Sequence, residues 1–114
     1  MMVKTVLLTA TILVLTVSLA LAAGSVSKGK ALFNDPKFAG ATSGNSCNTC
    51  HPGGTGLEQA GSKKVFHIAG KTQESLEEAV NACIVHAIEG KALDPGSEAM
   101  QDVVAYIKSL KSKS

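Results

Sequence analysis

The segment Cys47-Asn48-Thr49-Cys50-His51 constrains this 114-residue chain more than any other. Two cysteines three positions apart, followed directly by a histidine, match the attachment signature of a c-type haem. Thiols at this spacing reach the two vinyl groups of one porphyrin, and the imidazole that follows binds the iron as proximal ligand. The motif therefore predicts one covalent haem c, attached through Cys47 and Cys50 and ligated by His51.

The motif has two other interpretations. A thioredoxin-like dithiol should follow a strand and open a helix, whereas His51 is followed by Pro52-Gly53-Gly54-Thr55-Gly56, which is typical of a loop. Half of a zinc site would need a second ligand pair. His67, Cys83 and His86 supply one only as scattered single residues. Both interpretations account for less of the chain than a haem does.

The first 22 residues have the pattern of an export signal. Lys4 precedes an apolar run over Val6 to Leu19, and Ala20-Leu21-Ala22 is a small-x-small cleavage site. We expect residues 1–22 to be a cleaved signal peptide and residues 23–114 to be one domain in the periplasm. An uncleaved membrane anchor is the alternative, since the run of about 18 apolar residues is at the lower limit for spanning a bilayer.

Size and charge limit the function classes further. A domain of this size often needs a metal, a disulfide or a cofactor for stability. The chain has 11 basic residues, all of them lysine, against nine acids, for a formal net charge of +2. Nucleic acid binding normally shows a basic surplus and bidentate arginine contacts. We therefore expect no nucleic acid partner.

Helical patterns account for most of the remaining sequence. The first helix is expected from about Ser27 to Asn34, before Asp35-Pro36. The second is expected to be capped by Thr72 and to stop at Gly90. Its apolar residues recur at spacings of three and four: Leu76, Ala79, Val80, Cys83 and Ala87. The Cys83 side chain should therefore point inward.

The last helix is expected to follow a Ser97 cap and to reach about Ser112. Val65 to Ile68 alternates too briefly to predict a strand. The sequence thus predicts an all-α domain.

Three features occur in an order that resembles the class I cytochromes c. They are Gly29-x-x-Leu32-Phe33, the haem motif, and Ala105-Tyr106-Ile107. The resemblance implies a small cytochrome c fold whose N- and C-terminal helices cross beside the haem, with Gly29 giving room for Tyr106. It also implies a monomeric electron carrier between redox proteins rather than an enzyme.

The sixth iron ligand departs from that family's pattern. Such cytochromes place a methionine in the loop before the last helix, but residues 91–96 contain none. The candidates are Met100, Cys83, His86 and His67. A thioether suits a cytochrome and raises its potential, which favours Met100. Cys83 would be an odd cysteine in an oxidising compartment, which indicates an intermolecular or a reactive thiol. An inward position disfavours an intermolecular disulfide and leaves an inert buried thiol or an iron ligand. The choice between Cys83 and Met100 stays open.

A second resemblance bears on that choice. The segments Val80-Asn81-Ala82-Cys83, Gly90-Lys91-Ala92-Leu93 and Ser97-Glu98-Ala99-Met100 are similar to haem domains of the thiosulfate dehydrogenase and sulfur-oxidising cytochrome group. This similarity implies that Cys83 is a thiolate ligand and that Met100 belongs to the core. The alternative function is a haem subunit of an inorganic sulfur-oxidising enzyme, with a second haem on a partner chain.

Overall fold

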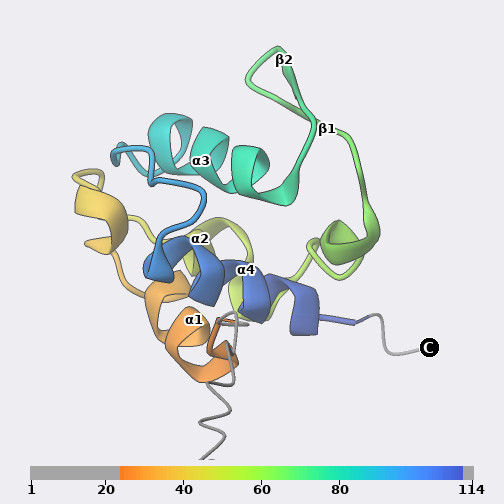
Figure 1. Ribbon diagram of the computed structural model, residues 1–114. Coiled ribbons are helices and arrows are strands. Elements are labelled where there is room, and N and C mark those ends of the chain that lie inside the picture. Colours follow the sequence, from red (N-terminus) through yellow and green to blue (C-terminus); the bar gives the residue numbers. More distant parts are fainter. Residues whose placement is uncertain (1–23, 112–114) are drawn as a thin grey trace, which may run out of the picture.

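The computed structural model describes residues 24–111 and contains four α-helices and one small sheet (Figure 1). The helices are α1 (Val26–Phe33), α2 (Cys47–Cys50), α3 (Leu76–His86) and α4 (Glu98–Ser109). Three short 3-10 turns lie at Phe38–Gly40, Pro52–Gly54 and Ala60–Ser62. The predicted signal peptide, residues 1–22, lies outside the described residues.

The α1 and α4 helices pack directly against each other, and both lie below α3 in the view of Figure 1. A Cβ atom added at Gly29 would collide with the carbonyl oxygen of Asp102 and lie 2.8 Å from the Cβ of Tyr106. The rings of Phe33 and Tyr106 meet edge to face, with centroids 5.0 Å apart. The prediction that Gly29 gives room for Tyr106 is therefore confirmed.

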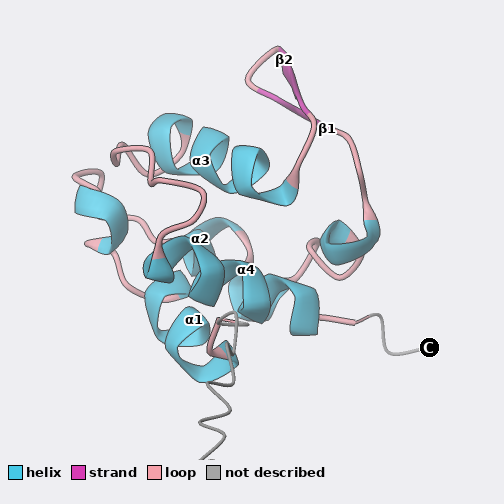
Figure 2. Cartoon of the chain, viewed as in Figure 1, coloured by secondary structure: helices cyan, strands magenta, loops and turns pink. Residues whose placement is uncertain are grey.

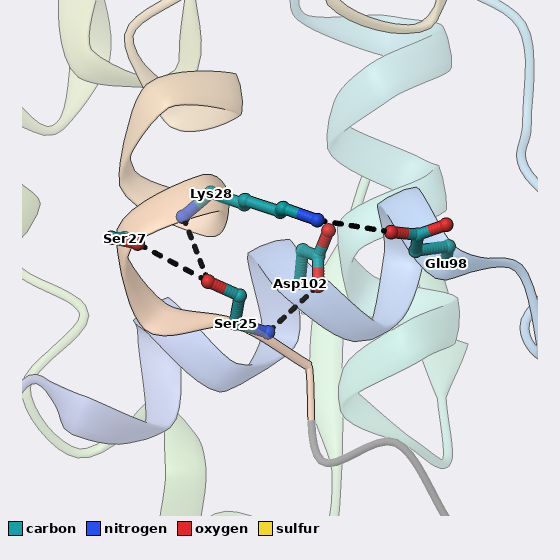
Figure 3. A network of polar contacts seen from close by, with 5 residues as sticks. All are labelled: Ser25, Ser27, Lys28, Glu98 and Asp102. Atoms are coloured by element: carbon teal, nitrogen blue, oxygen red, sulfur yellow. Dashed lines mark hydrogen bonds and ion pairs between the residues drawn. The ribbon is translucent and has the colours of Figure 1, made fainter.

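A polar network fixes the start of α1 to α4 (Figure 3). The Ser25 hydroxyl accepts from the Lys28 amide at 3.2 Å and caps α1. The Ser25 amide donates to the buried carboxylate of Asp102 at 2.7 Å. Lys28 also pairs with Glu98 at 3.4 Å, but these side chains are 67% and 77% exposed. The buried contact should therefore matter more than the exposed ion pair.

Asp102→Ala should lower the free energy of unfolding by about 1–2 kcal/mol, because the Ser25 amide loses a charged acceptor. Lys28→Ala breaks only the exposed pair and should cost at most about 0.5 kcal/mol. Chemical denaturation of the two variants beside the parent protein checks the difference. Equal losses would mean that the Asp102 contact does not anchor α1.

The prediction of an all-α domain is wrong. Strands β1 (Phe66–Ile68) and β2 (Lys71–Gln73) form a two-stranded antiparallel sheet, in which His67 faces Thr72 (Figure 2). Ala69 and Gly70 both have positive φ, at 53° and 74°, as a two-residue hairpin turn requires.

The Gln73 side chain strengthens this short hairpin. Its oxygen accepts from the Ile68 amide at 3.0 Å, and its nitrogen donates to the Ile68 carbonyl at 3.1 Å. An amide side chain thus supplements the backbone pairing. Three-residue strands carry too little alternation to be recognised without such contacts.

The helix after the hairpin starts later than predicted. Thr72 is a strand residue, and the cap of α3 is Ser75, whose hydroxyl accepts from the Glu78 amide at 3.1 Å. The α3 helix ends at His86, before the predicted stop at Gly90. Ser97 caps α4 as predicted, and α4 ends at Ser109.

Candidate functional site

The two motif cysteines lie on α2, a single helical turn that has its own cap. The Ser46 amide donates to the Thr49 hydroxyl at 2.9 Å, and the two side-chain oxygens lie 3.4 Å apart. This reciprocal arrangement satisfies donors at the start of the helix. The spacer residue Thr49 therefore helps to form the turn that presents both thiols.

The imidazole of His51 is oriented by the loop that follows it. Its Nδ1 atom lies 3.0 Å from the carbonyl oxygen of Thr55. A carbonyl oxygen can only accept, so Nδ1 must carry the hydrogen and donate it. The lone pair is then on Nε2, which is the tautomer needed to bind a metal through that atom.

An apolar pocket of about 100 Å³, partly open to solvent, adjoins the motif. Cys47, Cys50 and His51 line it together with side chains from several other elements. These include Phe33 of α1, Leu57 and Ala60 of the loop after the motif, Phe66 and Ile68 of β1, and Val103 and Ile107 of α4. Apolar walls with a few convergent polar groups are typical of cofactor sites.

The α3 helix supplies another wall of the pocket through the stripe that the sequence predicts. Leu76, Ala79, Val80, Cys83 and Ala87 all line the pocket, so the prediction that Cys83 points inward is confirmed. Burial, and to a lesser degree the neighbouring Cys83, raises the pKa of the Cys47 thiol to about 11. Burial and the neighbouring Cys50 raise the pKa of Cys83 as well. Cys47 and Cys83 therefore share one poorly hydrated space, whereas Cys50 is exposed at its edge.

The other three candidate iron ligands lie elsewhere. Met100 is 0% exposed and belongs to the core, but it is not among the residues that line the pocket. His86 and His67 are exposed, and the Nδ1 atom of His67 lies 3.4 Å from the Thr72 hydroxyl oxygen. Among the four candidates for the sixth position, only Cys83 faces the space beside His51.

Asn81 holds the connection between α3 and α4. Its nitrogen donates to the Leu93 carbonyl, and its oxygen accepts from the Leu93 amide, both at 2.8 Å. Asn81 and Cys83 are two residues apart and so point about 200° apart around the helix. The connection is thus tied to the side of α3 that faces away from the pocket.

No protein family, curated protein or solved structure matches the chain. Within residues 24–111, no three His, Cys, Asp or Glu side chains are grouped closely enough to hold a metal ion. None of the helices in that range is long and apolar enough to cross a membrane.

Several residues of the site were not predicted from the sequence. Phe66 and Ile68 reach the pocket because of the hairpin, and Thr55 contacts His51 through its backbone carbonyl. A backbone contact leaves no signal in the residue type. The Gly-rich composition after His51 indicates only that a tight loop exists there.

Proposed function

We propose that this chain is a periplasmic monohaem c-type cytochrome that carries single electrons between redox proteins. One observation carries the proposal. Cys47, Cys50 and His51 line the same apolar pocket, and the thiol of Cys83 lines it too. Together they provide two attachment points, an imidazole and a further sulfur, arranged around a space for an apolar group.

The residues present fit a haem in their chemistry. Cys47 and Cys50 would hold it covalently, and His51 would bind the iron through Nε2 because Nδ1 is engaged by Thr55. Cys83 is the sixth ligand that the pocket favours. A haem, when bound, would gain or lose one electron, and no bond of the protein would be made or broken.

The protein's own residues would then shield that group and set its potential. Apolar side chains from α1, the hairpin, α3 and α4 line the pocket and would limit the access of water to that group. Pro52, Gly53, Thr55 and Gly56 are exposed beside His51 and offer an approach for a redox partner. Encounters of this kind bury little area and are weak.

Export of the full chain in a bacterial host that attaches haem c tests the proposal. We expect one haem per chain that stays bound through denaturing electrophoresis, and a reduced spectrum with the bands of a c-type haem. Replacing both Cys47 and Cys50 by serine should abolish this covalent haem. Cys83→Ser is the matched control, since it removes a thiol of the same pocket but should leave the attachment intact.

The proposal fails if the parent protein releases its haem on denaturation or never acquires one. It also fails as an electron carrier if the attached haem is not reduced and reoxidised reversibly by small redox mediators.

The position of Cys83 favours a second candidate function, a haem subunit of an inorganic sulfur-oxidising enzyme. Cys83 lines the pocket and Met100 does not, which is the ligand set expected for that group. Reduction of the haem by thiosulfate, alone or with a second haem-bearing chain, would support this candidate. Reduction only by protein partners or mediators would favour the simple carrier.

A further inference from the structure

We infer that Asn48, in the spacer between the two haem cysteines, is a positioning residue for the proximal imidazole. The inference rests on the proposed function and assigns a role within the same site. Asn48 belongs to α2 and is half-buried, and its side chain reaches the turn that follows His51 in the sequence. There its Oδ1 atom accepts from the Gly53 amide at 2.8 Å.

The turn that Asn48 holds is the one that orients His51. The Gly54 amide donates to the His51 carbonyl at 2.8 Å, and the Thr55 amide donates to the Pro52 carbonyl at 3.1 Å. The turn ends at the Thr55 carbonyl, which accepts from Nδ1 of His51. Asn48 therefore acts on the imidazole through two linked hydrogen bonds.

Two further contacts limit movement of this loop. The Glu58 carboxylate accepts from the Gly56 amide at 2.9 Å. Gly54 is buried beneath the end of α4, where an added Cβ would lie 2.8 Å from one methyl group of Leu110. The Thr55 hydroxyl also donates to the Pro52 carbonyl at 2.6 Å. Asn48 is the residue that holds the Gly53 amide within this turn, so its loss should free Gly53 first.

The bond from Nδ1 to Thr55 controls how strongly the imidazole donates electrons to a metal. A well-placed acceptor draws the Nδ1 proton away and makes Nε2 a stronger base. A stronger donor favours ferric over ferrous iron and lowers the reduction potential. If Asn48 keeps Thr55 in place, its loss should weaken this effect.

The test compares three variants of the haem-loaded protein. Asn48→Ala removes the acceptor, Asn48→Asp retains an oxygen at the same position, and Asn45→Ala is the matched control. The Asn45 side chain makes no hydrogen bond among those found for residues 24–111. Only the backbone amide of Asn45 does so, by donating to the Ser43 hydroxyl. The measurements are the midpoint potential and the hydrogen exchange of the Gly53 amide.

We expect Asn48→Ala to raise the midpoint potential and to speed exchange of the Gly53 amide by roughly fivefold. Asn48→Asp should keep the amide protected, with a potential at or below that of the parent protein. Asn45→Ala should change neither quantity.

An attached haem whose potential is unchanged in Asn48→Ala would overturn this inference alone. The inference would also be overturned if Asn48→Asp raised the midpoint potential as much as Asn48→Ala does while the Gly53 amide stayed protected from exchange. Failure of all variants, and of the parent protein, to hold covalent haem would overturn the proposed function and this inference with it.

Discussion

Cys83→Ala should convert the six-coordinate, low-spin ferric haem of the proposed cytochrome to a form that lacks its sulfur ligand. The Cys83 thiol lies on the apolar face of α3 and lines the same pocket as the motif residues. Alanine fills part of that space but cannot bind iron, so water or an added ligand takes the position. The midpoint potential should rise by about 0.1 V or more, because axial ligands tune haem iron over roughly 0.8 V.

Met100→Leu is the matched control for that experiment. Met100 is fully buried among core residues and does not line the pocket. Leucine has a similar volume, so the core should tolerate it at a cost below about 1.5 kcal/mol. Absorption spectra of both oxidised variants out to the near-infrared decide the matter. Loss of a methionine-type charge-transfer band in Met100→Leu, with Cys83→Ala unchanged, would reverse the ligand assignment.

Gly29→Ala should destabilise the protein by about 3 kcal/mol or more, at the upper end for an overpacked site. The added Cβ would collide with the backbone carbonyl of Asp102, which cannot rotate away as a side chain could. The helices must separate instead, which weakens the contact between Phe33 and Tyr106. The higher helix propensity of alanine returns only about 1 kcal/mol.

Thermal unfolding of the haem-loaded protein measures this effect. A loss of this size should lower the midpoint by at least about 10 °C for a domain of this length. Lys30→Ala, at an exposed position of the same helix, should change the stability by no more than about 0.5 kcal/mol. If the Gly29→Ala and Lys30→Ala variants have the same unfolding midpoint, α1 does not pack on α4 as closely as described.

The helices that face a common core could be predicted because their patterns are long. The pocket stripe of α3 has apolar residues at helical spacing over three turns, and α4 has a serine cap that the sequence shows plainly. The Gly29 contact was predicted from a family resemblance, and the structure supplies its physical reason.

The hairpin could not be predicted, because tertiary contacts stabilise it more than local preference does. Phe66 is buried against the pocket, and Gln73 uses its side chain to hold Ile68. Thr72 has the chemistry of a helix cap but is engaged in strand pairing, so Ser75 takes that role. For the site, the sequence identified the motif and Cys83, whereas the supporting contacts of Asn48 and Thr55 depend on the path of the loop.

The paired hydrogen bonds between Asn81 and Leu93 bear on how fast a sixth ligand could be exchanged. A ligand on a free loop leaves the iron when the loop swings open. Here the connection is tied to α3, and Cys83 is part of α3 itself, which packs on both the hairpin and α4. Release of a Cys83 ligand would therefore require movement of a packed helix, and the rate of ligand exchange would follow the stability of that helix.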